Sequence, residues 1–432
     1  MSQTREPPTL RHRSNHLPYD VVLNILGQLP VKSVMRLRSV SKSLYSFFAS
    51  PDFISTHNNN NINHDNAHVI HIESESTRVT NRQVCMVALA RTFDRISEIG
   101  VPFDFPTKCV QIVGSCNGLL CLADYPPGNV VHLWNPSIRR FKKLPHTCLG
   151  LLKHVTLGFA FCSKSNDYKV VRTSGSSLST SEIEMYSLSS DSWKRVEISV
   201  TTDVIFCKNL VSPIPFVSGA LHWMASVKEE NRMTETDIMA FDVNSEKFRK
   251  LALPHGSIDG PLLQRCVASF RGKLAFFEES GFQYSIWVMG DYGVFESWNK
   301  LFVVPFERVS CWISLTDYGS LMVWYRNDQA EGQGFEHALI DIETLQEKKD
   351  PDIQHPSYVA AFMESLVLLD GTNVESYWWV GGEHINWRYG GMDEVKPLFI
   401  PFPLVVGMID SIAKAWLLFH VYITLSFWGY YK

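Results

Sequence analysis

The sequence predicts an α+β chain of several domains, in which a small all-α segment at the N-terminus precedes an all-β repeat domain, most simply an irregular β-propeller. Two observations lead to this prediction. Between residues 17 and 56, apolar side chains recur at helical spacing. Further on, an aromatic residue followed by polar residues returns about every 50 residues, as in a repeat architecture. The length of 432 residues and a hydrophobic content of 45% allow two or three domains with a sizeable core.

Helical signals begin near the N-terminus, after residues 1–16, which are polar and basic and are expected to be disordered. Pro18 suits the first turn of a helix, and the negative charge of Asp20 beside it suits the helix dipole. Further apolar sets extend the helical pattern to Phe48. Three helices of roughly 8–12 residues bury too little surface to fold alone, so the segment should present apolar surface to a partner.

This segment reads LPYDVVLNILGQLPVKSVMRLRSVSKSLYSFFASPDF and resembles the F-box of substrate adaptors in cullin-type ubiquitin ligases. The resemblance implies that it binds an Skp adaptor, which links such proteins to the cullin scaffold. The residues that match the adaptor-packing positions of the family are Leu17, Pro18, Ile25, Leu29, Pro30, Val34, Leu37 and Val40. One departure is Leu44, where relatives usually carry Trp, and the third helix could pack more loosely for that reason.

Charge and cysteine content narrow the classes of partner. The net charge of −4 gives no sign of a nucleic-acid partner, and Arg36, Arg38 and Lys42 are interpreted as a solvated helix face. The nine cysteines are scattered without a CxxC pair, which indicates free thiols in the cytoplasm or the nucleus. The N-terminus lacks the apolar stretch of a secretion signal.

Residues 57–68, HNNNNINHDNAH, are expected to form an Asn-rich linker between the helical segment and the β-domain. The alternative is a metal cluster built from His57, His64, His68 and His71. No cysteine or carboxylate pattern at ligand spacing accompanies these histidines, so we expect neither a metal nor another cofactor.

The repeat places an aromatic residue at four positions separated by 52, 55 and 50 residues, namely Phe141, Trp193, Phe248 and Trp298. A weaker fifth copy is expected at Leu345, 47 residues further on. Each aromatic residue follows a turn, and an apolar strand precedes the turn, which predicts a series of hairpins. The aromatic residues are interpreted as core residues that pack one blade on the next, rather than as a row of ligand-binding side chains.

Three or four strands in each unit of about 50 residues are typical of a propeller blade, whose faces are buried only when consecutive blades stack. A Gly-x-Leu pattern upstream of the hairpins, as at Gly118, Gly219 and Gly272, marks another strand start. The period resembles that of kelch repeats. Because the Gly-Gly doublet of kelch blades is absent from these units, an irregular or sandwich-like β-fold stays open.

The β-region also resembles the F-box-associated interaction domain of plants, in segments such as VGSCNGLLCL (113–122) and VSGALHWMA (217–225). This second resemblance implies a domain over residues 69–371 that captures a protein target for ubiquitination. The sequence leaves the target-binding residues unknown. We expect target contacts first at the most loop-like insertions, which are 125–128, 228–236 and 327–334.

Residues 372–432 do not fit the family resemblance, and their last part is almost wholly apolar. Three accounts stay open: a closing strand or blade of the β-domain, a tail anchor, or translated sequence that is not normally coding. The final stretch AWLLFHVYITLSFWGY has 16 residues and contains a histidine, which argues against a membrane-spanning helix.

No enzyme motif is present, since the sequence lacks GxSxG, a Walker-type loop, GxGxxG, HExxH and paired cysteines. Together the two resemblances imply a non-catalytic subunit of an SCF-type (Skp–cullin–F-box) ubiquitin ligase. Such a subunit binds the Skp adaptor, and through it a cullin, and holds an unidentified target protein. The alternative is an interaction or decoy protein with the same two modules and no ligase, and a propeller enzyme comes third.

Overall fold

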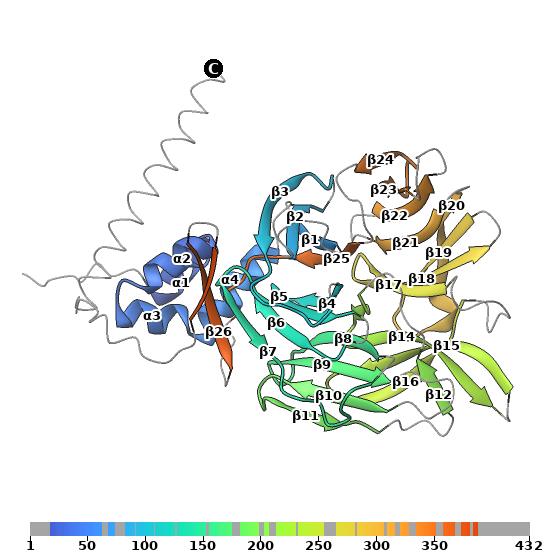
Figure 1. Ribbon diagram of the computed structural model, residues 1–432, viewed down its shortest axis with the longest axis horizontal. Coiled ribbons are helices and arrows are strands. Elements are labelled where there is room, and N and C mark those ends of the chain that lie inside the picture. Colours follow the sequence, from blue (N-terminus) through green and yellow to red (C-terminus); the bar gives the residue numbers. More distant parts are fainter. Residues whose placement is uncertain are drawn as a thin grey trace, which may run out of the picture. The chain divides into compact units, whose positions relative to one another are not determined.

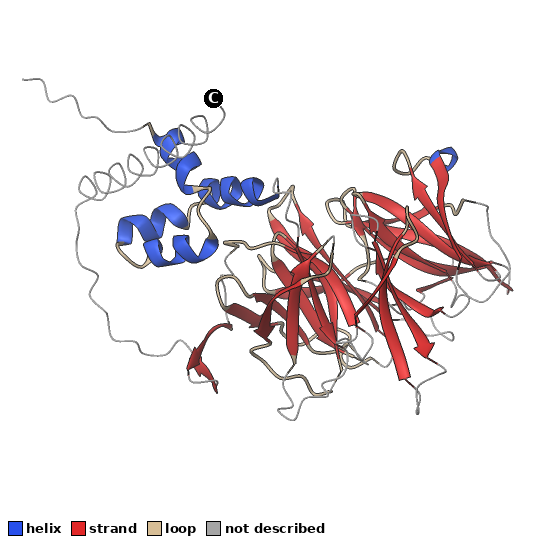
Figure 2. Ribbon diagram, turned by 90° about the horizontal axis from the view of Figure 1, so that it is seen from above, coloured by secondary structure: helices blue, strands red, loops and turns tan. Residues whose placement is uncertain are grey.

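A computed structural model of the chain describes residues 18–62, 68–73, 83–90, 92–107, 109–125, 128–152, 155–174, 182–197, 203–206, 213–229, 232–254, 265–280, 283–305, 309–315, 320–327, 334–350, 357–367, 373–380 and 383–387. Its contacts define two compact units. One includes Met1–Asn63 and contains the α-helices, and the other is His64–Gly390. Figure 2 shows strands throughout the second unit, with one short 3-10 helix, η2 (Phe295–Ser297), among them.

Four helices follow one another in the helical unit: α1 (Tyr19–Leu26), α2 (Val31–Arg38), α3 (Lys42–Phe48) and α4 (Pro51–Ile62). Prolines set two of the starts, because Pro18 and Pro30, with φ of −54° and −56°, directly precede α1 and α2. Ser41 caps α3, and its side chain accepts a hydrogen bond from the Leu44 backbone N–H at 3.2 Å. Local sequence thus determines where the first three helices begin.

Helix α4 corrects the expectation of an Asn-rich linker over residues 57–68. The helix continues to Ile62, and a strand already begins at His68. Asparagine has a modest helix propensity, but tertiary packing overrides it here. Phe53 in α4 is fully buried against Phe48 in α3, with ring centroids 4.9 Å apart. Packing at Phe53 and, one turn later, at the buried His57 holds the helix that continues through most of the asparagine run.

Two histidines of the alternative metal cluster, His57 and His71, are buried in separate units. His57 lies in α4, fully buried, and its Nε2 is 2.9 Å from the Leu29 carbonyl oxygen. His71 is buried in a strand of the other unit, and His64 lies outside the described residues. Across the described ranges, no three His, Cys, Asp or Glu side chains are grouped as a metal ion would require.

The β unit is a six-bladed propeller, whose antiparallel sheets follow one another round a ring in Figure 1. From the centre outward, blade 1 contains β25 (Ser357–Phe362), β1 (His68–Glu73), β2 (Val84–Leu89) and β3 (Arg95–Gly100). Blade 2 contains β4 (Val110–Cys116), β5 (Leu119–Asp124), β6 (Val131–Asn135) and β7 (Arg140–Lys143). Blade 3 contains β8 (Val155–Cys162), β9 (Asp167–Ser174), β10 (Ile183–Ser187) and β11 (Ser192–Arg195).

Blades 4 to 6 repeat the arrangement. Blade 4 contains β12 (Asp203–Phe206), β14 (Ala220–Glu229), β15 (Arg232–Asp242) and β16 (Lys247–Leu251), with β13 (Phe216–Val217) beside β14. Blade 5 contains β17 (Arg265–Phe270), β18 (Lys273–Ser280), β19 (Gln283–Met289) and β20 (Trp298–Pro305). Blade 6 contains β21 (Val309–Leu315), β22 (Ser320–Asn327), β23 (Gly334–Asp341) and β24 (Glu347–Asp350). The predicted propeller is confirmed, and the sandwich-like alternative is wrong.

The ring closes by pairing strands from the two ends of the β unit. Strand β25 pairs antiparallel with β1, so that Ala360 stands opposite Ile70. Strands near the ring centre then contact one another in turn, from β25 to β4, β8, β14, β17, β21 and back to β25. Closure protects the edges that the first and last blades would otherwise expose.

Six clusters of buried side chains form the core, one between each pair of neighbouring blades. The predicted role of the recurring aromatic residues is confirmed, because each belongs to the cluster that its blade shares with the preceding one: Phe141, Trp193, Phe248 and Trp298. The two indoles also tie the blades together. Trp193 and Trp298 donate their ring N–H to the carbonyl oxygens of Pro145 and Ala252, each at 3.0 Å, in the crossover from the preceding blade.

The fifth copy of the repeat is displaced by two residues from the expected position. Before the outer strand of blades 2, 3 and 4, the hairpin places Arg139, Asp191 and Glu246 at positive φ, and the aromatic residue follows two positions later. Leu345 occupies that turn position in blade 6, with φ of 56°, and is 47% exposed. Glu347 therefore stands where the other blades have the aromatic residue, and Leu345 is not a core residue.

Part of residues 372–432 extends the outer edge of blade 2. Strand β26 (Val374–Val380) pairs with β7, and β27 (Glu383–Trp387) pairs with β26. Tyr377 is buried, and its hydroxyl accepts a hydrogen bond from the Trp134 indole at 3.2 Å. This segment is not the closing strand, because β25 closes the ring. Residues 388–432 lie outside the described residues, and no helix within the described part is long and apolar enough to cross a membrane.

Candidate functional site

The helical unit carries the first candidate site, an apolar surface on short helices. Of the eleven large apolar side chains that are exposed in the described residues, four belong to this small unit: Tyr19 (54%), Val21 (40%), Val40 (45%) and Tyr45 (51%). Such a concentration of exposed apolar groups indicates a surface that binds another protein.

The structure divides the predicted adaptor-binding residues between the surface and the core of the helical unit. Val34 is fully buried, so it supports the surface and offers no contact area of its own. Leu17 lies outside the described residues. The predicted residues that are exposed or half-buried are Pro18, Ile25, Leu29, Pro30, Leu37 and Val40.

Sequence reasoning missed Tyr19 and Tyr45 as members of this surface, and it misplaced Arg38. The Arg38 guanidinium carbon lies 4.0 Å from the centroid of the Tyr45 ring, and the arginine is only 7% exposed. Arg38 is therefore not part of the solvated helix face expected from Arg36, Arg38 and Lys42. The stacking depends on the angle between α2 and α3, for which the sequence contains no signal.

The second candidate site is the end of the propeller where the second strand of each blade leads to the third. All three expected insertions fall on such connections: 125–128 between β5 and β6, 228–236 between β14 and β15, and 327–334 between β22 and β23. Because strand direction alternates within each blade, the strand ends that bound these insertions lie at one end of the ring. We call this end the insertion face. Most of 228–236 is strand, and residues 126–127, 230–231 and 328–333 lie outside the described residues.

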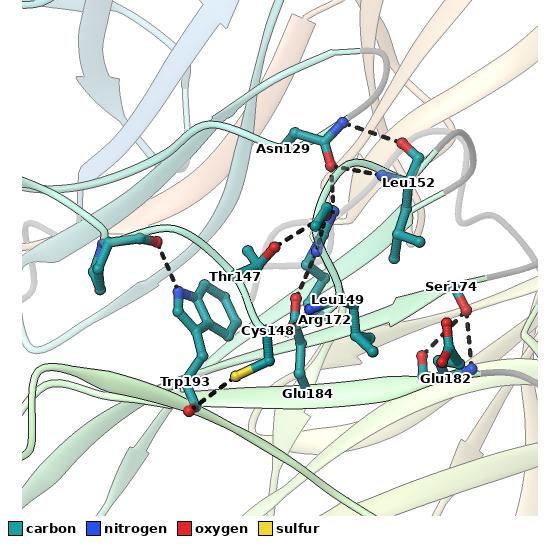
Figure 3. A network of polar contacts seen from close by, with 12 residues as sticks. Asn129, Thr147, Cys148, Leu149, Leu152, Arg172, Ser174, Glu182, Glu184 and Trp193 are labelled. Carbon is teal, nitrogen blue, oxygen red and sulfur yellow. Dashed lines mark hydrogen bonds and ion pairs between the residues drawn. The ribbon is translucent and has the colours of Figure 1, made fainter.

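At the insertion face, a buried ion pair holds the crossover from blade 2 to blade 3 (Figure 3). Arg172 on β9 stands opposite Glu184 on β10, both side chains are fully buried, and Nη1 lies 2.5 Å from Oε1. Both terminal nitrogens of Arg172 donate to the Gly150 carbonyl oxygen at 3.1 Å. Oε2 of Glu184 accepts from the Leu149 backbone N–H, also at 3.1 Å. The pair therefore binds the backbone of the crossover as well as itself.

Asn129 completes the network from the connection between β5 and β6 (Figure 3). Its Oδ1 accepts hydrogen bonds from Arg172 and from the Leu152 backbone N–H, the latter at 3.2 Å. Its Nδ2 donates to the Leu152 carbonyl oxygen at 3.1 Å. One amide side chain thus holds both polar groups of a single backbone residue, as a neighbouring strand would.

A polar pocket of about 470 Å³ opens at the opposite end of the ring, between the hairpins of blades 3 and 4. Lys169 and Lys194 line it and share the carboxylate of Glu246, at 2.9 and 2.6 Å. Partial burial alone would raise the pKa of Glu246, but hydrogen bonds from these two lysines hold it below its usual value. Glu246 and Asp167 in the lining together offset two of the three lysine charges there, which weakens the case for an anion site.

The thiols of the propeller core have the environment of structural cysteines. Burial raises the pKa of the Cys121 and Cys266 thiols well above the ordinary value, which opposes formation of a reactive thiolate. Cys148, in the crossover of Figure 3, is exposed, and its Sγ lies 3.2 Å from the Trp193 carbonyl oxygen. No disulfide joins the cysteines whose side chains the structure describes.

Two family models match the chain, one on each unit. The model described as F-box domain matches residues 14–56. The model described as F-box associated beta propeller domain matches residues 60–327, which is more than half of the chain.

Curated relatives from Arabidopsis thaliana match over about two thirds of the chain. F-box protein CPR1 is 27% identical over 314 residues, covering 67% of this chain and 73% of the relative. F-box protein At5g49610 is 28% identical over 299 residues, covering 65% and 77%. F-box/kelch-repeat protein At3g23880 is 26% identical over 310 residues, covering 67% and 80%. Among solved structures, TolB from Acinetobacter baumannii aligns at a TM-score of 0.43 and 14% identity over 73% of each chain, a similarity too low to bear on function.

Proposed function

Since the chain belongs to the F-box-associated β-propeller family, we propose that it is the substrate-recognition subunit of an SCF-type ubiquitin ligase. The helical unit binds an Skp adaptor, and through it a cullin, while the propeller binds a target protein. The observation that carries the proposal is that the F-box match falls on the unit with four exposed large apolar side chains. An adaptor would cover those side chains and remove their apolar surface from water.

The chain contributes proximity and no covalent step in this proposal. The adaptor and cullin hold it near a ubiquitin-loaded conjugating enzyme, and the propeller holds the target. Holding the target there raises the effective concentration of its lysines at the conjugating enzyme. Neither matched family is described as an enzyme domain, which supports a receptor that is not itself an enzyme.

We infer further that this is a plant protein that acts in the cytoplasm or the nucleus. The relatives reported above are from Arabidopsis, and no disulfide joins the cysteines whose side chains are described, as is usual in a reducing compartment. Imaging of a fluorescently tagged chain in plant cells tests the inference. Signal confined to the secretory pathway would contradict it.

The affinity of the full chain for a purified plant Skp adaptor tests the ligase proposal. Two changes should each lower the affinity at least about tenfold: the double variant Leu17→Ala/Pro18→Ala, and Val40→Asp, which would place an unpaired charge against the adaptor's apolar surface. Ile96→Asp is the matched control, since Ile96 is 50% exposed but lies on β3 in the propeller. Biolayer interferometry measures all four proteins.

Two results would contradict the proposal at different levels. No binding by the intact chain would reject the ligase role. Equal binding by the wild type and all three variants would leave the role standing but reject the assigned interface.

Protein turnover separates a ligase receptor from an interaction protein that binds the adaptor without a ligase. Expression of the wild-type chain should shorten the half-life of at least one protein in plant cells, and proteasome inhibition should restore it. The Leu17→Ala/Pro18→Ala variant should have no such effect. Identical turnover with the two chains would favour the interaction or decoy alternative.

A further inference from the structure

We propose that Leu151 is an apolar anchor with which the propeller binds its target, and that the buried Arg172–Glu184 pair, drawn in Figure 3, holds this anchor in its binding conformation. This proposal rests on the proposed function as a target receptor and names the chemistry of the partner. The partner is a folded protein with an apolar pocket that accepts a side chain the size of leucine.

Leu151 is far more exposed than any other large apolar side chain in the described residues. It is 87% exposed, and the next is Tyr19 at 54%. Burying a leucine side chain away from water lowers its free energy, and nothing in the described propeller provides that burial. Because the side chain protrudes from a crossover loop, a surface that buries it must be concave. Protruding apolar side chains that fill a partner's pocket supply much of the binding energy in protein interfaces.

The backbone on both sides of Leu151 is held by groups on the propeller itself. Before it, the Gly150 carbonyl oxygen accepts two hydrogen bonds from Arg172. After it, Leu152 is held through its N–H and its carbonyl oxygen by Asn129. A loop that is already ordered loses little conformational entropy on binding, so the contact area of Leu151 contributes more fully to affinity.

The position of the ion pair indicates that its charged groups are needed to hold the crossover loop by hydrogen bonds. On β9, Arg172 follows Tyr168 and Val170 on the side that faces blade 2, where the cluster between the blades is apolar. Replacing a buried ion pair with apolar residues of similar size is often neutral for stability or even favourable. Apolar residues could fill this space, but they could not hold Gly150 and Leu149 by hydrogen bonds. Holding the loop is the contribution that requires the charges.

The anchor also lies where target contacts are expected. Asn129, which holds Leu152, follows directly on the insertion 125–128, and the crossover reaches the same end of the ring. The polar pocket lies at the other end, and there Glu246 pairs with both Lys169 and Lys194. The insertion face therefore combines the most exposed apolar side chain with a fixed backbone.

Site-specific photo-cross-linking tests the proposal. The full chain carries a diazirine side chain at position 151 or, as the matched control, at position 345. Leu345 is likewise an exposed leucine, but its hairpin lies at the opposite end of the ring. After irradiation in an Arabidopsis cell extract, we expect a discrete adduct from position 151 and none from position 345. Excess wild-type chain should suppress the adduct, and excess Leu151→Asp should not.

The affinity of each variant for the purified target protein, identified by cross-linking, measures how much Leu151 and the ion pair contribute to binding. Leu151→Asp should weaken binding about 30-fold or more, the usual effect of losing a central anchor, whereas Leu345→Asp should leave it unchanged. The double variant Arg172→Met/Glu184→Leu should weaken binding about tenfold, mainly through faster dissociation, because the anchor remains but its loop is released. Melting temperatures near that of the wild type are expected for both Leu151→Asp and the double variant.

The possible failures are distinguishable. No adduct at position 151, an adduct suppressed equally well by Leu151→Asp, or unchanged affinity in Leu151→Asp would overturn the anchor. Full affinity in the Arg172→Met/Glu184→Leu variant would overturn the positioning role of the pair. Adaptor binding is measured separately, so its loss would reject the ligase role without touching the evidence for the anchor.

Discussion

In the helical unit, four large apolar side chains remain exposed within 45 described residues, whereas in the propeller the apolar side chains fill six clusters between the blades. Chain length explains the contrast, since helices of seven to twelve residues have little area with which to cover one another. A closed ring of sheets lets every blade cover two neighbours. The small helical unit therefore leaves a larger share of its apolar side chains exposed, whereas most of those in the propeller are buried between neighbouring blades.

Opening the ring should have the largest effect on the stability of the propeller. A chain truncated after Asp350 loses β25, which leaves the edge of β1 unpaired and removes Val359 and Phe362 from two of the core clusters. We expect loss of the near-ultraviolet circular dichroism of the propeller and aggregation. A truncated chain that stayed soluble and unfolded cooperatively would show that closure is not needed.

A cavity inside the propeller core should have the next largest effect. Trp223 is fully buried between blades 3 and 4. Trp223→Ala should lower the free energy of unfolding of the propeller by about 3–5 kcal/mol, because the lost contacts and the cavity add. Urea denaturation followed by tyrosine and tryptophan fluorescence measures the change. A loss below about 1 kcal/mol would indicate that the blades repack freely.

Removing only the outer strands should have a moderate effect. A chain truncated after Val367 keeps β25 and the hydrogen bond from Asn135 Nδ2 to the Val367 carbonyl oxygen at 2.9 Å, but it lacks β26 and β27. Loss of the buried Tyr377 should lower the free energy of unfolding by roughly 1.5–3 kcal/mol. Comparison with the truncation after Asp350 isolates closure. Unchanged stability would mean that the outer strands add nothing to the fold.

Acid should weaken the propeller core through a buried histidine. His132 is 3% exposed and stacks on Phe103 at 4.1 Å, and burial, with a smaller contribution from Lys143, lowers its pKa to about 3. The folded pKa lies below the unfolded value, so protonation favours the unfolded chain. The contribution of neutral His132 to stability is therefore complete above about pH 6.5 and decreases as the pH falls towards 3.

His132→Phe should remove this part of the pH dependence while keeping a ring in the stack. Between pH 7 and pH 5 the wild type should lose about 2 kcal/mol more than the variant. Urea denaturation at the two pH values measures the difference. Equal losses in the two proteins would show that His132 is accessible to protons without unfolding.

The smallest effect on stability is expected at the surface of the helical unit. Val40 is 45% exposed, so Val40→Ser should change the free energy of unfolding by no more than about 0.5 kcal/mol. Thermal denaturation followed by circular dichroism checks this expectation. A loss of several kcal/mol would place Val40 in the core and weaken the contrast between the two units.

The helical segment shows how far sequence reasoning reaches. Pro18, Pro30 and Ser41 set helix starts through effects within one turn, and such effects are visible in the printed sequence. The division of the predicted adaptor-binding residues into exposed and buried members was not visible. Val34 is fully buried and Val40 is 45% exposed, although both were assigned to the same apolar surface. Only the packing of the helices against one another separates them.

In the propeller, too, some features could be predicted from the sequence and others could not. The aromatic repeat predicted blade packing because Phe141 and its counterparts recur at a fixed place in each hairpin. The anchor at Leu151 has no such signal. Its exposure and its rigid backbone depend on Arg172 and Asn129, which are 43 positions apart and meet only when blades 2 and 3 are stacked.

The order of a helical and a β-repeat unit, the hairpins and the recurring core residues could be predicted from the sequence, because these depend on patterns among near neighbours. The ring closure by β25, the helix through most of the asparagine run and the ordered loop around Leu151 could not be predicted in this way. Each of these depends on groups brought together from distant positions. His57 and Leu29 are 28 positions apart, and Trp134 and Tyr377 are 243 apart. Contacts over such separations form only once the chain has folded.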